Sequence, residues 1–206
     1  MDMNGDLVGN STSTEITSVS LAERFQRRAV ELARSGTLGN LKTRKAGLQA
    51  AYGHFVGLLD NPTVPVMIYG EAGSGKKRLV EEYLVLHNFY RKMEGLPAGG
   101  LKVIRGDFVV AGFTQQLLTP TARTADIIYI ERIELLSADC QKEFLDHLTL
   151  RIEFAERGVI MPRLVIGTEK ALSMMVLRKE FSRELFQAIT GFSIFLPSLN
   201  ERSEDL

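Results

Sequence analysis

A glycine-rich segment, Gly70-Glu71-Ala72-Gly73-Ser74-Gly75-Lys76, separates a short apolar run from a long amphipathic stretch. The run at 66–69 is too short for a helix and predicts a buried strand, while the stretch from 76 to about 92 predicts a helix. The phosphate-binding loop pattern is a specific signal when it lies between a strand and a helix, and this segment does. The segment matches the first seven positions of that pattern. We therefore expect a phosphate site built into an α/β fold.

The composition of this loop explains how it could hold phosphates. Glycines let backbone N–H groups turn toward phosphate oxygens, the helix N-terminus adds positive potential, and the Lys76 ammonium can reach the terminal phosphates. The expected ligand is ATP or ADP, and the candidate binding residues are Gly70, Glu71, Ala72, Gly73, Ser74, Gly75, Lys76 and Lys77. The alternative is a glycine turn that only joins a strand to a helix.

The eighth position of the pattern departs from the rule, because Lys77 stands where Ser or Thr would place a hydroxyl on Mg²⁺. An ammonium cannot ligate a metal ion, so we expect the nucleotide to bind either with or without Mg²⁺. Lys77 and Arg78 either add positive charge near the phosphates or are simply solvated at the start of the helix. The sequence leaves both alternatives open.

The rest of the chain alternates short apolar runs with longer amphipathic segments. Further strands are expected at 101–104, 127–130, 163–166 and 192–196, and helices at 114–118, after Ser137, and at 171–189. Two more helices, from Ser20 to about Gly36 and over 48–59, precede the first strand. This order predicts a three-layer α/β core with a mostly parallel five-stranded sheet, preceded by two N-terminal helices. The expected organisation is a disordered tail at 1–19, a helical segment at 20–61 and the core at 62–206.

Composition excludes several classes of protein. The chain has 25 Lys plus Arg against 25 Asp plus Glu, which argues against a polybasic nucleic-acid binder. A single cysteine, Cys140, excludes a disulfide framework and fits a reducing compartment, so the cytoplasm is the expected location. Cys140 itself lies in an amphipathic helix and is expected in the core, and the histidines at 54, 87 and 147 lack metal-ligand spacing. No apolar stretch approaches the roughly 20 residues that span a bilayer, so no membrane role is expected.

A second candidate site lies at the end of the expected strand at 127–130. An ATPase of this architecture needs a carboxylate there to hold the metal, and Glu131 follows the strand directly. Glu131 is therefore the candidate catalytic and Mg²⁺-binding carboxylate. The next position, where an acidic residue would activate water, is Arg132, and arginine cannot accept a proton at neutral pH.

With these motifs in place, the chain from about Pro65 to Leu206 resembles the AAA+ central domain of bacterial enhancer-binding proteins that activate sigma-54 RNA polymerase. The loop at 70–76 is similar to the family's GExGxGK segment, and 127–148 and 163–168 are similar to its next two strands and the intervening helix. The longest similarity is at 192–206, FSIFLPSLNERSEDL, which resembles the family's FPIRLPPLRERxEDI. The resemblance implies a P-loop NTPase fold and ATP hydrolysis between subunits of a ring.

Several working positions differ from those of the family that the chain resembles. Besides Glu131 and Arg132, the sensor position after Thr168 is Glu169, the first arginine-finger position is Ser182, and the second is Ala188. Arg183 lies one residue after the first arginine-finger position and is the candidate catalytic arginine in its place. The segment between 105 and 127 is shorter than in the family and lacks the GAFTGA loop. The chain also ends where the family continues into a helical lid and a DNA-binding module, so we expect neither a lid nor direct DNA binding.

Three hypotheses follow. The first is a degenerate AAA+ domain, a pseudo-ATPase that binds ATP or ADP with little or no hydrolysis and regulates transcription by contacting another AAA+ subunit or a signalling protein. The second is a weakly active ATPase in which Glu131, Glu134 or Glu169 activates water and Arg183 acts as the finger. The third is an interaction scaffold that no longer binds nucleotide.

Overall fold

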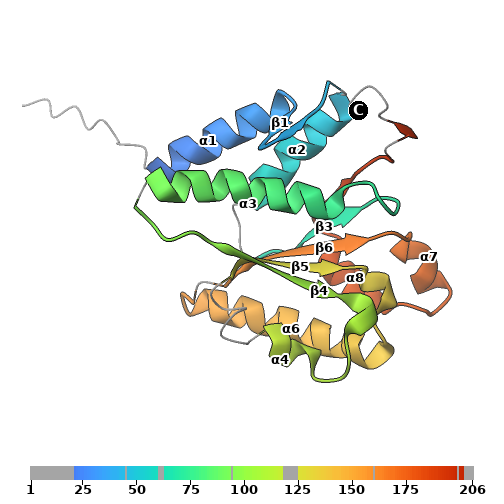
Figure 1. The fold of residues 1–206 in the computed structure, drawn as a ribbon. Helices are drawn as coiled ribbons and strands as arrows, with labels where there is room; N and C mark the ends of the chain where they lie inside the picture. Colours follow the sequence, from blue (N-terminus) through green and yellow to red (C-terminus); the bar gives the residue numbers. More distant parts are fainter. Residues whose placement is uncertain are drawn as a thin grey trace, which may run out of the picture.

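The computed structural model describes residues 21–44, 46–59, 63–93, 95–117, 125–159, 161–198 and 200–201. In this part of the chain, a central sheet is covered by helices on both faces, which gives three layers (Figure 1). The tail predicted at 1–19 and the cap predicted at Ser20 lie outside the described residues. Among the described helices, none combines the length and the apolar composition needed to cross a membrane.

The central sheet has five parallel strands in the order β4-β5-β6-β3-β7. Their bounds are β3 Val66–Tyr69, β4 Gly100–Arg105, β5 Ala125–Glu131, β6 Arg163–Thr168 and β7 Ser193–Phe195. The strands are apolar because parallel strands are buried on both faces. All five lie where the sequence predicts them, which confirms the predicted fold class.

Seven described α-helices form the outer layers. One face is covered by α1 Leu21–Arg34, α2 Ala46–Leu58 and α3 Lys76–Met93. The other carries α4 Phe113–Leu117, α6 Ala138–Glu156, α7 Leu172–Leu177 and α8 Arg183–Ile189. Ser137 caps α6 as predicted, because its side chain accepts a hydrogen bond from the Cys140 backbone N–H.

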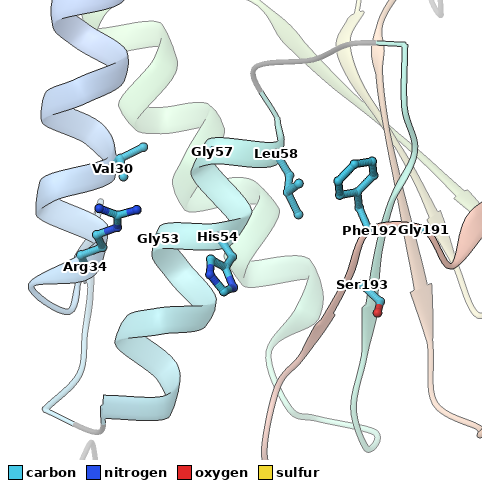
Figure 2. Close-up of a pocket in the computed structure, with 9 residues that line it drawn as sticks. All are labelled: Val30, Arg34, Gly53, His54, Gly57, Leu58, Gly191, Phe192 and Ser193. Atoms are coloured by element: carbon cyan, nitrogen blue, oxygen red, sulfur yellow. The ribbon is translucent and has the colours of Figure 1, made fainter.

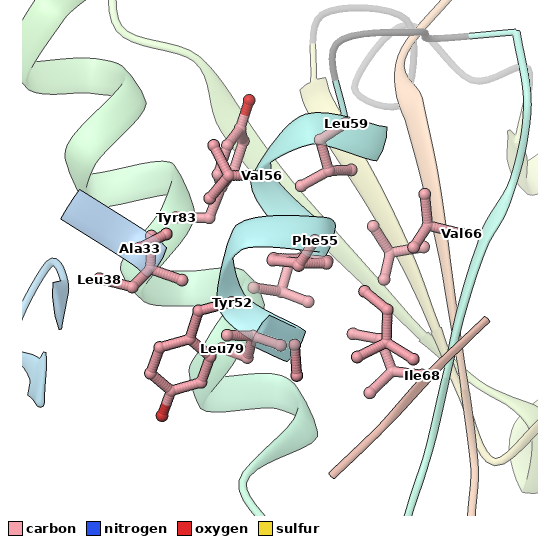
Figure 3. Close-up of a cluster of buried hydrophobic side chains, with 14 of the residues drawn as sticks. Ala33, Leu38, Tyr52, Phe55, Val56, Leu59, Val66, Ile68, Leu79 and Tyr83 are labelled. Atoms are coloured by element: carbon pink, nitrogen blue, oxygen red, sulfur yellow. The ribbon is translucent and has the colours of Figure 1, made fainter. Parts of the chain in front are cut away.

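Two hydrophobic clusters, one on each face, hold the layers together. Along β5, Ile127 and Tyr129 belong to the first cluster, whereas Ile128 and Ile130 belong to the second. This alternation follows from the two-residue period of a strand. In the first cluster, Phe55 of α2 packs edge-to-face against Tyr83 of α3, with their ring centroids 5.8 Å apart (Figure 3). The N-terminal helices are thus built into the same core as the sheet. Cys140 is buried in the second cluster, as predicted.

The single helical stretch expected at 171–189 is divided into α7 and α8. Between them, Lys179 adopts a left-handed conformation with φ of 60°, and Phe181 is buried in the second cluster. Ser182 then begins α8 as its N-cap, accepting a hydrogen bond from the Leu185 N–H at 3.2 Å. The cap and the buried anchor together explain why one helix became two.

A short hairpin between α1 and α2 was not predicted from the sequence. It consists of β1 Thr37–Leu38 and β2 Leu41–Lys42, joined through Gly39 and Asn40. Strands of two residues carry too little hydrophobic pattern to be recognised. The buried Glu82 of α3 holds the turn, accepting hydrogen bonds from the Asn40 backbone N–H at 2.7 Å and from its side-chain Nδ2 at 2.9 Å. Arg78 pairs with the same carboxylate.

The Gly39 turn gives a test of this tether. Gly39 has φ of +57°, and a Cβ there would lie 2.4 Å from the Glu82 Oε2 atom. We expect Gly39→Ala to lower the free energy of unfolding by about 1–3 kcal/mol, because it adds backbone strain and displaces the carboxylate. The control is Gly47→Ala in α2, where the added methyl meets nothing within 4 Å. That variant should gain up to about 1 kcal/mol. Urea unfolding followed by circular dichroism measures the free energy of unfolding of both variants. Equal effects of the two substitutions would contradict a stabilising role of the Glu82 contacts with the turn.

His147 of α6 gives a second test, through pH. Burial, together with the smaller effect of the neighbouring Arg151 charge, lowers the pKa of His147 from 6.5 to about 4. Between pH 6.5 and pH 4 the histidine binds a proton in the unfolded chain but stays neutral in the folded protein. The free energy of unfolding should therefore decrease by ~3 kcal/mol as the pH falls from 6.5 to 4. His147→Leu should remove this component and flatten the dependence of unfolding free energy on pH. Identical slopes for both proteins would refute the assignment.

Candidate functional site

The topology of the sheet singles out the carboxyl ends of β3 and β6. The helix after β3 covers one face of the sheet, whereas the helices after the adjacent β6 cover the other. Ligands of open α/β sheets bind outside the carboxyl ends of strands at such a reversal. The loop at 70–75 leaves β3 at this point, and the Gly70 N–H donates to the Thr168 carbonyl at the end of β6 at 3.2 Å.

The glycines of the loop are required by its backbone geometry. Gly73 and Gly75 have φ of +75° and +85°, in the left-handed region that glycine adopts at little cost. Gly70 is required for a different reason, because a Cβ there would lie 2.3 Å from the Leu196 carbonyl oxygen just after β7. The loop is therefore held closely between its neighbouring strands.

Lys76 begins α3 with its ammonium folded onto the loop. Its Nζ donates to the carbonyls of Gly70 at 2.7 Å and Glu71 at 2.9 Å, and the side chain is buried. Burial lowers the pKa of Lys76, while the negative charges of Glu169, Glu134 and Glu131 oppose that shift. A buried cation at a helix N-terminus that also carries glycine N–H groups is suited to receive an anion.

Three carboxylates converge on Lys76 from neighbouring strands. Glu131 ends β5 and Glu169 follows β6, as the sequence predicts, while Glu134 comes from the short 3-10 helix η2 Ile133–Leu135. Glu134 is buried, and its Oε1 accepts a hydrogen bond from the Glu169 backbone N–H at 3.1 Å. Its Oε2 is also buried and has no hydrogen-bond partner among the described residues. A buried carboxylate oxygen without a partner is costly, which marks Glu134 as a candidate functional group.

Arg132 occupies the position where the sequence analysis expects an acid that activates water. Its backbone is left-handed with φ of 59°, an uncommon conformation for a residue other than glycine. The guanidinium lies between two acids, with Nε 3.7 Å from Glu169 Oε2 and Nη1 3.6 Å from Asp107 Oδ2. A hydrogen bond from Arg105 is the main reason why the pKa of Asp107 is lowered. Arg132 therefore bridges the candidate site and the η1 turn, Gly106–Phe108.

Lys77 and Arg78 both point along α3. Lys77 Nζ lies 3.8 Å from the Glu81 carboxylate in an exposed pair one helical turn away, and Arg78 pairs with Glu82. Of the two alternatives that the sequence leaves open for Lys77, this geometry favours a solvated cation. An exposed pair of this kind contributes little stability.

The arginine-finger positions that the sequence predicts all lie at or in α8. Arg183 is exposed at the start of α8 and makes no hydrogen bond or ion pair with any described residue. It lines a hollow of about 340 Å³ between α6 and the α7–α8 turn. Ser182 serves as the α8 cap, and its own N–H donates to the Gln141 side chain at 2.7 Å. Ala188 is exposed in α8.

Two features of this region were not predicted from the sequence, the ion pairs of Asp107 and the position of the Tyr129 hydroxyl. Asp107 lies in a stretch without periodicity, and only the spacing of Arg105 and Asp107 at the end of a strand could have drawn attention to it. Tyr129 is fully buried in β5, and its hydroxyl lies over Gly167 of β6. Burial raises the pKa of Tyr129, and the charges of the three glutamates raise it further.

No group of three or more His, Cys, Asp or Glu side chains in the described ranges has the geometry of a metal site. The assignment of Glu131 to Mg²⁺ therefore stays a prediction.

Comparisons with known proteins identify the fold. No family model and no curated protein matches the sequence. Solved structures of NtrX from Brucella abortus do match: the complex with ATP has a TM-score of 0.57 and 16% sequence identity over 89% of this chain and 44% of the NtrX chain. The complex with ADP has a TM-score of 0.53 and 14% identity over the same shares. The chain thus spans less than half the length of NtrX, and what the two share is the fold, a parallel α/β sheet with helices on both faces.

Proposed function

We propose that this chain binds ATP or ADP through its loop at 70–76, hydrolyses the nucleotide slowly or not at all, and acts as a regulatory or interaction module. The observation that carries the proposal is the buried Lys76 ammonium, which lies against the glycine loop at the switch point of the sheet. Backbone N–H groups of the loop would surround the phosphates, and Lys76 would exchange its carbonyl partners for phosphate oxygens. The NtrX structures with ATP and ADP support nucleotide as the ligand of this fold.

The surroundings of Arg132 support slow hydrolysis. A general base contributes about 10²- to 10⁴-fold in rate, and an arginine finger about 10³- to 10⁵-fold. Arg132 cannot act as a base, and its ion pairs with Glu169 and Asp107 hold it in place. Arg183 lies one place away from the first arginine-finger position that the resemblance implies, and that position itself is Ser182. Nucleotide binding, by contrast, depends on the loop and Lys76.

Glu134 favours a second candidate function, a weak ATPase. Its buried Oε2, without a partner among the described residues, is the carboxylate oxygen best placed to orient a water near the phosphates. Mg²⁺, when bound with the nucleotide, would supply charge neutralisation, and Glu131 is the residue that would hold it through water. A third candidate, an interaction scaffold without nucleotide, has no observation of its own in its favour.

The regulatory role is proposed on the family resemblance. The expected partner is another AAA+ subunit or a signalling protein in transcription regulation. We do not propose direct DNA binding, because the net charge of the chain is zero.

Nucleotide binding can be tested by titrating the protein with a fluorescent ATP analogue, with and without Mg²⁺. We expect saturable binding that Lys76→Met weakens at least ~10-fold, since charge-assisted hydrogen bonds to phosphate are lost. The matched control is Lys77→Met, which should change affinity less than about twofold because Lys77 faces Glu81. Unfolding curves show whether each variant is folded. Absence of saturable binding, or equal losses in the two variants, would contradict the proposal.

Hydrolysis can be tested by measuring phosphate release under saturating ATP. We expect a rate close to the background that the Lys76→Met variant shows, because Arg132 stands at the position expected for the general base and cannot accept a proton. Turnover well above this background that Glu134→Gln reduces ~10²-fold or more, with affinity unchanged, would establish the weak ATPase instead. Glutamine keeps the hydrogen bond to Glu169 and removes only the charge, so the variant separates catalysis from folding.

A further inference from the structure

A groove with a volume of about 560 Å³ lies between α1, α2 and the start of β7, away from the phosphate loop (Figure 2). It is lined by Val30, Arg34, Gly53, His54, Gly57, Leu58, Gly191, Phe192 and Ser193. Part of the wall is apolar, with Leu58 of α2 and Phe192 facing each other, and Phe192 is 43% exposed. A Cβ at Gly57 or Gly191 would meet nothing within 4 Å, so these glycines leave open space. The volume is within the usual range for ligand sites.

The strand beside this groove is the edge of the sheet. β7 pairs only with β3 among the described strands, and its other side faces no strand. The Met67 N–H donates to the Phe192 carbonyl, and the Leu196 N–H donates to the Tyr69 carbonyl, both at 2.9 Å. In a parallel pair alternate residues bond to a given neighbour, so the N–H and C=O groups of Ser193 and Phe195 point to the open edge. Such an edge can accept another extended segment.

The charge of the groove is positive. Among the described residues that line the groove, Arg34 and His54 have ionisable side chains and none is a carboxylate. Neither side chain makes a hydrogen bond or an ion pair with any described residue. The stem of Arg34 lies over Gly53, where a Cβ would be 2.6 Å from Arg34 Cγ. This contact places the guanidinium at the groove, where it is available to an anionic partner.

From these three observations we propose that the groove binds an extended, acidic peptide segment of another protein, which adds a strand to the open edge of β7. The main chain of the segment bonds to Ser193 and Phe195. One apolar side chain enters the space between Leu58 and Phe192, and an acidic side chain pairs with Arg34. This proposal does not require nucleotide binding, because the groove lies at the start of β7 and uses other residues than the loop at 70–75, which lies at the end of the neighbouring β3.

The binding test uses the whole chain and a fluorescein-labelled hexapeptide of alternating valine and glutamate, followed by fluorescence polarisation. We expect saturable binding in the micromolar range, because a three-residue edge offers few hydrogen bonds. The same peptide with lysine in place of glutamate should not bind. Arg34→Glu should weaken binding at least ~10-fold, whereas Arg27→Glu on the exposed face of α1 should leave it unchanged within about twofold.

Blocking the groove gives a second, charge-independent test. Gly57→Leu fills the open space and should abolish binding, while Gly47→Leu, at an equally open position of the same helix, should not. Strand addition also makes a specific prediction for hydrogen exchange: the peptide should slow exchange of the Ser193 and Phe195 amides and leave that of Ile194 unchanged. The proposal is overturned if the acidic peptide does not bind, if Gly57→Leu and Gly47→Leu bind alike, or if the two edge amides are not protected.

Discussion

The position of every candidate group in this protein depends on the parallel alignment of β3 and β6. Strands that run the same way end at the same edge of the sheet, so Gly70, at the end of β3, and Thr168, at the end of β6, are joined by a main-chain hydrogen bond. That bond sets the phosphate loop beside the turn that carries Glu169, and Glu169 in turn bonds to Glu134. The site is thus assembled by backbone geometry, and the two hydrophobic clusters fix that geometry on both faces.

Arg132 shows how the structure accommodates an arginine in an uncommon backbone conformation. The guanidinium is paired with Asp107 and Glu169, and the backbone accepts a left-handed conformation that costs about 1–2 kcal/mol for a residue with a Cβ. Strain of this kind is found where the surrounding structure over-determines a residue. Here the constraint comes from the close approach of Gly106, since a Cβ there would lie 2.2 Å from the Arg132 carbonyl oxygen. The result is an ion-pair bridge between the ends of β4, β5 and β6.

Strong local patterns made most of the fold predictable. Buried parallel strands are short apolar runs, and the loop at 70–76 has a spacing that few other structures share, so both could be found from the sequence. The break at Lys179 and the hairpin at Gly39 could not be found, because each depends on distant side chains: Phe181 reaching the core, and Glu82 reaching back from α3. The sequence predicted that Glu131 and Glu169 each follow a strand, whereas the burial of Glu134 and the groove beside β7 depend on contacts between segments far apart in the sequence.

The contact between Gly70 and the Leu196 carbonyl has a mechanical consequence. β7 is about 10 Å long. Phe192, just before the strand, lines the groove, and Leu196, just after it, lies against the loop at 70–75. There is no room for even a methyl group at Gly70, so the Leu196 end of β7 is closely packed. A displacement of β7 along its axis would therefore bring the Leu196 carbonyl oxygen against the backbone of Gly70, so the groove and the loop at 70–75 lie at the two ends of one short strand.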